Sequence, residues 1–589
     1  MSKPKLALIP SGYKSGKVYS ILPNDATGDF DFTRQSIGTR VRKDGLIEEA
    51  KTVGSITNDF LYSEDYSKSE WLKSNITITT DQELAPDGTN TADEIFETSA
   101  TSSKILTQFT SVVSGKRYTT SFFVKYNNIR YLQLTGSTGF AGSIVNFDIQ
   151  NKTIVHNPSN ENARIDILAN DWVRISLTLS CSTTTSGRMM IAAVNSATAS
   201  RLVSYTGNTS NSFYLWGGMM SEGALSDYIK TEGSQVTQTV ETFTDVPRLD
   251  WLNINCPSLL LEPQRTNLQV FSEQFSNSSF WSRSRGTAIA DQQIAPNGEY
   301  TADKILGDGT GTTYFYDGIT LTNGNTYTIS IFIKPIINIS SFAINVFGGV
   351  GTAYFNLVDK TVNSTSGDFT SAKIEDYGNG WLRCSGTLTL SSATGSKNIG
   401  YGLIDFDGDQ YYLWGAQVEQ GSYPTSYIKT EASTVTRLKD ECLNGGDSDL
   451  FDFNECSIYL DLTPFVAGFD RDISLSAGTN DDRFTFFFRS NGTQLLFGVW
   501  AGGSNQLYRD ETITYNKRNK LLLTAKENEF KIYINGTLKF TDTFGVLPTG
   551  LNRFSFASPF NVSHFEGKIH DTRVYDRVLT EAEAIELTT

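Results

Sequence analysis

One long stretch of this chain occurs twice, and that duplication limits its fold more than any other feature. Residues 60–235 recur as residues 269–436, with the same landmarks in the same order. The matching landmarks are Trp71 and Trp281, the Thr-Ala-Asp turns at 91–93 and 301–303, the strand-like segments at 118–125 and 327–334, Trp172 and Trp381, and the Tyr-Leu-Trp-Gly motifs at 214–217 and 412–415. A unit that is copied whole has its own core and folds by itself. We therefore expect two similar domains, of a kind that binds or builds rather than catalyses.

The two copies differ in length at one place. Their spacing is nearly constant up to the second shared tryptophan and shortens before the third. The first copy therefore carries an extra loop somewhere in residues 181–212. Tryptophans beside strand-forming neighbours are expected in the two cores: Trp172, Trp216, Trp381 and Trp414.

The charge balance argues against a nucleic-acid partner. The 589 residues carry 64 Asp and Glu against 49 Lys and Arg, a formal net charge of −15 at pH 7, whereas phosphate binding needs clustered basic side chains. The five cysteines are scattered without a CxxC pair. They predict neither a disulfide framework nor a zinc site, and they favour synthesis in a reducing cytoplasm. No apolar run reaches the ~18 residues of a membrane-spanning helix, so we expect no membrane insertion.

Helical periodicity is nearly absent from the sequence. Short alternating or apolar runs, such as residues 172–179 and 327–334, are separated by turn clusters such as Asn379-Gly380. This pattern is typical of antiparallel β-sandwiches, so the predicted fold class is all-β. The one expected helix is short and C-terminal, where Thr580 and Glu583 stand at the spacing of a capping box.

Three motifs recur in both repeats: an opening Ser-Glu before a tryptophan, an Ala-Pro-(Asp/Asn)-Gly turn with Thr-Ala-Asp, and a closing Tyr-Leu-Trp-Gly with Tyr-Ile-Lys-Thr. On these motifs the repeats resemble the carbohydrate-binding-module-like jelly rolls of phage structural proteins. Residues 6–14, 31–36 and 39–48 resemble the start of phage virion proteins that carry such modules. In that family this opening runs on quickly into a stretch like residues 246–267, which here lies beyond the first repeat. The first repeat therefore looks inserted into a split N-terminal unit.

The C-terminal part carries motifs at residues 456–462, 530–538 and 567–583. On them it resembles the concanavalin A-like, laminin-G-type lectin fold. Independently of that resemblance, residues 530–534 alternate into Asn535-Gly536, which predicts a hairpin. The expected architecture is tandem antiparallel β-sandwiches, two jelly rolls plus a concanavalin A-like sandwich, with a short C-terminal helix. Its predicted parts are an N-terminal virion-attachment segment (1–59), the first jelly-roll repeat (60–235), a connector that packs with the N-terminal segment (236–268), the second jelly-roll repeat (269–436) and a lectin-type domain (437–589).

The sequence contains no recognisable catalytic constellation. Only three histidines occur, and His564 and His570 stand too far apart on a straight strand to share a metal. A glycanase needs two carboxylates roughly 5–9 Å apart. Asp461 looks isolated, and Glu566 and Asp571 point to opposite faces of a regular strand. We therefore expect no enzymatic activity.

A structural calcium ion is the one cofactor that the sequence suggests. Jelly rolls and laminin-G-like folds often hold such an ion with oxygen atoms from loops. The candidate ligands lie in corresponding turns of the two repeats: Asp87, Asp93, Asn297, Glu299 and Asp303. The competing interpretation is that these polar side chains form or solvate the turns without any metal.

Sugar binding would use exposed aromatic rings as stacking platforms. Aromatic residues that are not repeated are the better candidates, because repeated ones are expected to serve the fold. Phe484, Phe486 and Phe488 would share one face of a strand, and we expect that face in a core. Trp251 is also unrepeated, but only Trp500, just before a loop-like Ala-Gly-Gly-Ser-Asn, is retained as a ligand-binding candidate. Core burial is the alternative for Trp500 too.

Together the resemblances imply a phage virion protein, made in the host cytoplasm and assembled into the particle. The first hypothesis is a non-enzymatic head or tail fibre or spike whose sandwiches bind host-surface glycans, with several weak sites acting by avidity. The second is a structural decoration or assembly protein that contacts other virion proteins and binds no sugar. The third is a glycan depolymerase, which the missing carboxylate pair disfavours. From the resemblance we also expect a homo-oligomer, most simply a trimer.

Overall fold

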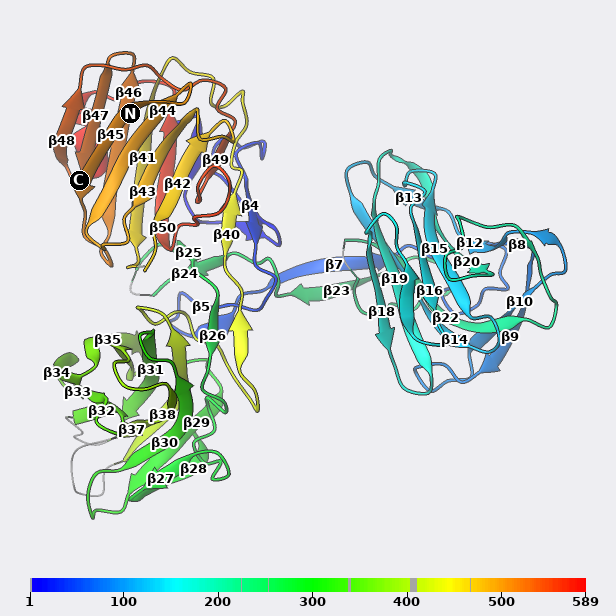
Figure 1. The fold of residues 1–589 in the computed structure, drawn as a ribbon, viewed down its shortest axis with the longest axis horizontal. Coiled ribbons are helices and arrows are strands. Elements are labelled where there is room, and N and C mark those ends of the chain that lie inside the picture. Colours follow the sequence, from blue (N-terminus) through cyan, green and yellow to red (C-terminus); the bar gives the residue numbers. More distant parts are fainter. Residues whose placement is uncertain (1–2, 224, 253, 337–340, 403–409, 467) are drawn as a thin grey trace. The chain divides into compact units, whose positions relative to one another are not determined.

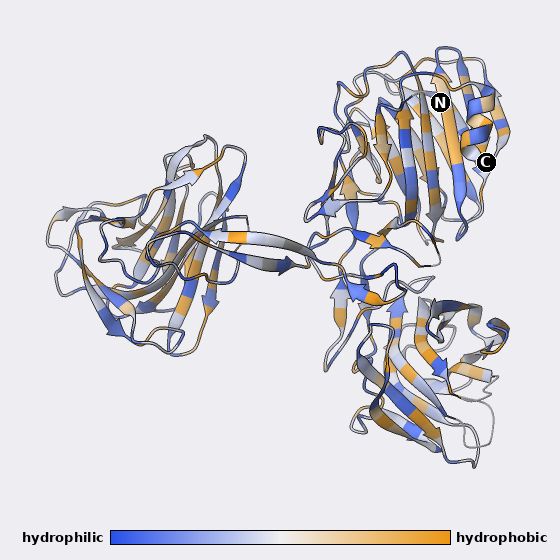
Figure 2. Ribbon diagram, turned by 180° about the vertical axis from the view of Figure 1, so that it is seen from behind, coloured by the Kyte–Doolittle hydropathy of each residue, from blue (hydrophilic) through white to orange (hydrophobic). Residues whose placement is uncertain are grey.

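The computed structural model describes residues 3–589 except 224, 253, 337–340, 403–409 and 467. Within this part the chain consists of β-strands and one short helix, α1 (Glu581–Thr588), which confirms the all-β prediction (Figure 1). Hydrophilic and hydrophobic residues alternate along many strands (Figure 2), because one face of each sheet packs into a core while the other is turned away from it. Among the described residues, no helix is long and apolar enough to cross a membrane.

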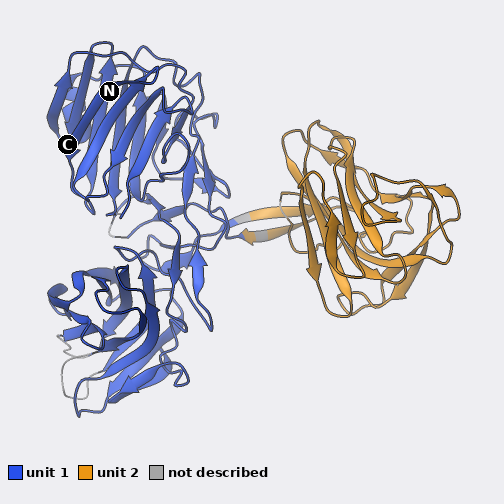
Figure 3. Cartoon of the chain, viewed as in Figure 1, with its two compact units in different colours: residues 1–52, 242–589 blue, residues 53–241 orange. Residues whose placement is uncertain are grey.

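The chain divides into two compact units (Figure 3). One unit is residues 53–241, and the other combines residues 1–52 with residues 242–589. The smaller unit contains the first repeat and extends past both ends of the predicted range 60–235. Two strands that pair with each other flank this repeat in the sequence: β7 (Thr52–Asn58) and β23 (Val236–Thr242).

The first repeat is a sandwich of two antiparallel sheets. The six-stranded sheet has the order β18 (Asn162–Ile167), β19 (Trp172–Ser180), β14 (Arg117–Tyr126), β22 (Ser212–Glu222), β10 (Ala92–Glu97) and β9 (Ile76–Glu83). The seven-stranded sheet has the order β17 (Thr153–His156), β16 (Ile144–Asp148), β15 (Tyr131–Ser137), β20 (Thr185–Val194), β12 (Lys104–Thr107) and β8 (Leu72–Ser74), with β13 (Thr110–Val112) also on β20. Two short strands pair beside them: β11 (Thr101–Ser102) and β21 (Tyr205–Thr206). The inner faces meet in one core that includes Trp71, Phe122 and Ile191.

The second repeat has the same plan. Its first sheet has the order β27 (Ser282–Ser284), β30 (Tyr314–Leu321), β37 (Gly395–Gly402), β32 (Ser341–Val346), β33 (Gly351–Asn356) and β34 (Thr361–Gly367). Its second sheet has the order β28 (Gly286–Ile294), β29 (Tyr300–Gly307), β38 (Gln410–Gln420), β31 (Thr326–Pro335), β36 (Trp381–Thr389) and β35 (Phe369–Gly378). The flanking strands again pair: β26 (Arg265–Asn267) and β39 (Val435–Arg437).

Buried polar groups are duplicated along with the strands. The side-chain amide of Asn58 donates hydrogen bonds to the carbonyl oxygens of Gly218 and Ile229, at 3.0 and 2.7 Å. Asn267 makes the equivalent two bonds in the second repeat, at 3.1 and 2.8 Å. Six tryptophans, including the four expected in the cores, are at most 4 % exposed: Trp71, Trp172, Trp216, Trp281, Trp381 and Trp414. The repeated tryptophans therefore serve the fold, as predicted.

The C-terminal sandwich also has two sheets. The larger has the order β24 (Arg248–Asp250), β25 (Ser258–Leu261), β50 (Gly567–Tyr575), β41 (Glu455–Pro464), β46 (Asn519–Lys526), β47 (Glu529–Ile534) and β48 (Thr537–Asp542), with β1 (Leu6–Leu8) also on β50. The smaller has the order β45 (Ser504–Thr512), β44 (Gln494–Ala501), β43 (Arg483–Phe488), β42 (Arg471–Ser476) and β49 (Arg553–Ser555). Phe484, Phe486 and Phe488 lie in the core between them, as expected.

Local predictions at the C-terminus are confirmed. Asn535 and Gly536 both have positive φ angles, 49° and 78°, in the turn between β47 and β48, as a two-residue hairpin loop requires. At the start of α1, the hydroxyl of Thr580 accepts the backbone N–H of Glu583, and the Glu583 carboxylate accepts the backbone N–H of Thr580. The helix packs Ala584 and Leu587 with tyrosine and leucine side chains of the larger sheet.

The C-terminal sandwich is not completed by residues 437–589 alone. Strand β1 and strand β25 both pair with β50, and Leu6, Leu8 and Leu259 are fully buried in the same core. Residues of the N-terminal segment also form a four-stranded sheet with the order β2 (Tyr13–Lys14), β3 (Lys17–Val18), β4 (Phe30–Thr33) and β40 (Glu441–Leu443), and a hairpin of β5 (Thr39–Val41) and β6 (Ile47–Glu49). The N-terminal segment and the connector are thus structural parts of this sandwich.

Candidate functional site

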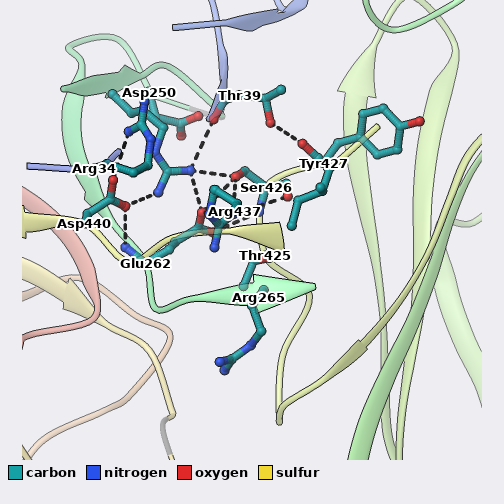
Figure 4. A network of polar contacts seen from close by, with 12 residues as sticks. Arg34, Thr39, Asp250, Glu262, Arg265, Thr425, Ser426, Tyr427, Arg437 and Asp440 are labelled. Atoms are coloured by element: carbon teal, nitrogen blue, oxygen red, sulfur yellow. Dashed lines mark hydrogen bonds and ion pairs between the residues drawn. The ribbon is translucent and has the colours of Figure 1, made fainter. Parts of the chain in front are cut away.

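A buried ionic network joins the N-terminal segment, the connector and the residues that follow the second repeat (Figure 4). The Asp440 carboxylate accepts a hydrogen bond from Arg34 at 2.9 Å and another from Arg248. Glu262 accepts a hydrogen bond from Arg248 at 2.6 Å and forms an ion pair with Arg437 at 2.9 Å. All five side chains are at most 4 % exposed. The network therefore links segments that are far apart in the sequence.

The charges in this network hold each other in the ionised state. Burial favours the protonated form of Glu262, but Arg437 and Arg248 outweigh it and hold the pKa of that carboxyl well below its usual range. Ser426 adds two bonds to the same carboxylate, from its backbone N–H at 2.9 Å and its hydroxyl at 2.8 Å. Removing one partner from a buried ion pair leaves the other charge without compensation. This network is an architectural element rather than a ligand site.

A cluster of aromatic rings lies on the outer face of the β30-containing sheet of the second repeat. Tyr314 and Tyr316 alternate with the core residue Phe315 on β30, so they point away from the core. Their ring centroids lie 5.3 and 5.5 Å from that of Phe347 in T-shaped contacts, and all three rings are partly exposed. Gly400 on β37 makes room for them, because a Cβ there would lie 2.6 Å from Phe347. The result is an aromatic platform on a sheet surface.

The corresponding sheet of the first repeat carries a groove of about 390 Å³ instead. Leu72, Ile105, Met190 and Arg188 line it from strands β8, β12 and β20. Leu106 and Ile191 on two of these strands lie in the core, so the groove is on the face turned away from the core.

The extra loop of the first repeat forms one wall of this groove. It is the link 195–211 between β20 and β22, and its Arg201 and Leu202 line the groove. The backbone N–H of Leu202 donates to the buried Gln133 side chain at 2.8 Å, and Asn146 donates to the carbonyl oxygen of Ala199 at 2.9 Å. The loop is therefore held onto the sheet by buried amides. The equivalent link of the second repeat, 403–409, lies outside the described residues.

Trp500 lies on the outer face of the smaller sheet of the C-terminal sandwich. Its ring covers Gly498, where a Cβ would collide with the indole, and the guanidinium carbon of Arg483 is 3.9 Å from the ring centroid. Tyr508, 56 % exposed, meets the indole in a T-shaped contact at 6.1 Å. Trp500 is thus half-buried on a sheet surface rather than in the core, and its ring is already stacked on an arginine.

The five calcium candidates do not come together as a metal site. Asp93 and Asp303 are buried, and each accepts two backbone N–H bonds: Asp93 from Tyr66 and Asp81 (2.8 and 3.2 Å), Asp303 from Ser276 and Asp291 (2.7 and 3.1 Å). Asp87 and Asn297 accept backbone N–H bonds within their own turns, from Thr89 and Glu299. Among the described residues, no group of three or more His, Cys, Asp or Glu could hold a metal ion. Calcium binding stays a prediction, and the shared geometry of Asp93 and Asp303 serves the turns.

Stability of the first repeat should fall between pH about 4 and about 7 because of Asp93. Burial raises the pKa of Asp93 to about 7 in the folded chain, against ~3.9 in an unfolded chain. Between these values the folded state binds the proton more tightly, so the free energy of unfolding decreases as the pH rises. We expect a loss on the order of 2–4 kcal/mol, measured by urea denaturation across this range. Asp93→Asn should flatten the dependence, and Asp87→Asn in the exposed turn that precedes β10 should not. An unchanged slope in Asp93→Asn would contradict this account.

The expectation that Asp461 is isolated is wrong. In the pairing of β41 with β50, Asp461 lies directly opposite Asp571, just before a bulge that follows at Leu462. That these two strands pair in this register could not be read from the sequence. Each carboxylate is nevertheless bound by its own arginine, Asp461 by Arg518 at 2.7 and 2.6 Å and Asp571 by Arg573 at 3.1 and 2.6 Å. These side chains form two ion pairs, which is not the arrangement of a free acid and a free base.

Comparison with known proteins identifies one part of the chain. Residues 449–584 match the concanavalin A-like lectin/glucanases superfamily. The C-terminal sandwich is therefore a concanavalin A-like domain, as its motifs predicted. The sequence matches none of the curated proteins with which it was compared.

Solved structures similar to parts of the chain include two carbohydrate-binding modules. One is the CBM40 of the Ruminococcus gnavus IT-sialidase bound to alpha2,3 sialyllactose, at 20 % identity, covering 23 % of this chain and 84 % of that chain with a TM-score of 0.21. Another is the CBM22-1–CBM22-2 tandem domain of Paenibacillus barcinonensis Xyn10C, at 10 % identity, covering 62 % of this chain and 98 % of that chain with a TM-score of 0.25.

Sequence reasoning missed most of these surface residues. Tyr314, Tyr316 and Phe347 have no aromatic counterparts in the first repeat, where Ile105 and Thr107 occupy the positions of the two tyrosines. The rule that unrepeated aromatics are ligand candidates would have found them. Arg188 could have been placed by strand alternation, but Arg201 could not, because it reaches the groove from a loop.

Proposed function

We propose that this chain is a non-enzymatic glycan-binding protein that a phage virion displays, as a head or tail fibre or spike, for attachment to the host surface. The observation that carries the glycan-binding part is the ring cluster of Tyr314, Tyr316 and Phe347 on an outer sheet face of the second repeat. Partly exposed aromatic rings supply flat apolar area with little conformational entropy to lose, which suits stacking against sugar rings. Trp500 with Tyr508 offers a second, smaller surface of this kind in the concanavalin A-like domain.

The virion part of the proposal rests on the N-terminal motifs and on the repeats. Motif residues Arg34, Arg248 and Glu262 all take part in the buried network, which supports a fixed scaffold for the attached sandwiches. We further propose that the chain binds other virion proteins, forms a homo-oligomer such as a trimer, and is made in the host cytoplasm before assembly. Several weak glycan sites on one particle would then act together by avidity.

Replacing the platform tests the glycan-binding part directly. The double variant Tyr316→Ala, Phe347→Ala should bind glycan-coated surfaces at least about tenfold more weakly, a loss of roughly 1.4 kcal/mol. The measurement is equilibrium binding of the intact chain to host cells or to their isolated surface glycans. Tyr300→Ala is the matched control, because Tyr300 is 64 % exposed on β29 of the other sheet. Equal binding by the double variant and the control would remove the platform from the proposal, and binding only to purified virion proteins would favour structural decoration.

A further inference from the structure

The groove of the first repeat contains positive charge that the protein itself does not neutralise. Among the described residues, Arg188 has no hydrogen-bond or ion-pair partner, and its Nε is buried without an acceptor. Its guanidinium carbon lies 4.8 Å from the ring centroid of Phe109. Arg201 donates only to uncharged oxygen atoms, the hydroxyl of Thr135 at 3.0 Å and the carbonyl of Gly136 at 2.7 Å. Both guanidinium groups therefore lack an anionic partner.

No acidic side chain of the described residues lines this groove, although Lys73 does. The Lys73 ammonium group already donates to three carbonyl oxygens, so it adds charge but few free donors. Elsewhere on the same sheet the chain does pair such charges: Arg130 donates to Asp148 at 2.9 and 2.7 Å. The chain as a whole has a net charge of −15. This groove, in contrast, is positively charged, because its arginines have no acidic partner.

We propose that this groove binds a carboxylate-bearing sugar residue, with Arg188 and Arg201 as the groups that hold the carboxylate. This inference rests on the proposed glycan-binding function and narrows its ligand class. A guanidinium group presents parallel N–H donors that match the two oxygens of a carboxylate. The partly exposed side chains of Leu72 and Ile105 supply an apolar surface for the carbon face of the sugar ring. The groove volume lies in the ~300–1,000 Å³ range of small-ligand sites.

The second repeat provides an internal comparison. In the paired registers of the two sheets, Tyr314 and Asn398 of the second repeat occupy the places of Ile105 and Arg188. The arginine of the first repeat thus corresponds to an asparagine in the second, and the isoleucine corresponds to a tyrosine. Duplication has produced one surface suited to an acidic sugar and another suited to a neutral sugar.

The test is calorimetric titration of the intact chain with oligogalacturonate, oligoglucuronate and a sialylated oligosaccharide, each beside its neutral methyl ester. We expect at least one acid to bind tenfold or more tightly than its ester, with affinity falling as sodium chloride is raised. Arg188→Gln and Arg201→Gln should each abolish this preference. Lys116→Gln, an exposed residue of the same repeat paired with Glu222, should leave the preference intact, as should Tyr316→Ala. Thermal unfolding of each variant checks that the repeat remains folded.

The possible outcomes separate this inference from the proposed function. Equal affinity for acids and esters, an unchanged preference in both arginine variants, or tighter binding of a sulfated oligosaccharide would overturn the inference. Binding of neutral glycans alone would overturn it while leaving the proposed function in place. Failure of every glycan to bind would overturn both.

Discussion

Replacing Asp440 by asparagine should destabilise the larger unit by about 3–5 kcal/mol, the cost of breaking a buried ion pair. The Asp440 carboxylate is fully buried and neutralises both Arg34 and Arg248. It also accepts the backbone N–H of Glu262 at 2.8 Å. An asparagine of the same shape removes the negative charge and leaves the two guanidinium groups buried without it. Because a domain has only about 5–15 kcal/mol of stability, we expect a large shift in urea denaturation of this unit.

The matched control is Asp576→Asn in the same unit. Asp576 pairs with Lys5 at 3.4 Å, but both side chains are nearly half exposed, and exposed pairs contribute about 0–1 kcal/mol. Denaturation followed by tryptophan fluorescence should therefore separate the two variants clearly. If Asp440→Asn unfolded at the same urea concentration as Asp576→Asn, the network would not hold these segments together.

The second large effect concerns the concanavalin A-like domain, whose fragment 437–589 should not fold cooperatively on its own. Strands β1 and β25 would be missing from beside β50, and with them the fully buried side chains of Leu6, Leu8 and Leu259. Losing a single buried leucine side chain typically costs about 2–5 kcal/mol, so losing several exceeds the stability of an ordinary domain. Near-ultraviolet circular dichroism and thermal unfolding of the fragment would measure this.

A second truncation serves as the control. Replacing residues 53–241 by a short Gly-Ser linker retains β1, β25 and the whole core of the C-terminal sandwich. This shortened chain should unfold cooperatively at nearly the temperature of its counterpart unit in the intact chain. A cooperative transition of the fragment 437–589 at that same temperature would show that the N-terminal strands are dispensable.

Features set by local pattern could be predicted from the sequence. The duplicated strands, the buried tryptophans, the Asn535-Gly536 hairpin and the capping box of Thr580 and Glu583 all depend on residues close together in the chain. In each case spacing along a strand or a helix turn determines which groups meet. The concanavalin A-like domain was likewise recognisable from its motifs.

Features set by distant pairing could not be predicted. Arg34 and Asp440 are 406 residues apart, and nothing in their neighbourhoods indicates which arginine meets which acid. Asp461 faces Asp571 only because β41 pairs with the distant strand β50 in this register. The groove depends on the extra loop folding back over the sheet, which buried Gln133 and Asn146 determine. Strand alternation gives the face on which a residue lies, but not what covers that face.

Glycan binding without turnover is the central claim, and an array of bacterial surface glycans probed with the intact chain tests it most directly. We predict saturable binding to a subset of glycans, reduced in the Tyr316→Ala, Phe347→Ala variant, with every glycan recovered at its original length. Absence of binding to all glycans at concentrations where several sites act together would contradict the claim. So would the release of shortened products with new reducing ends.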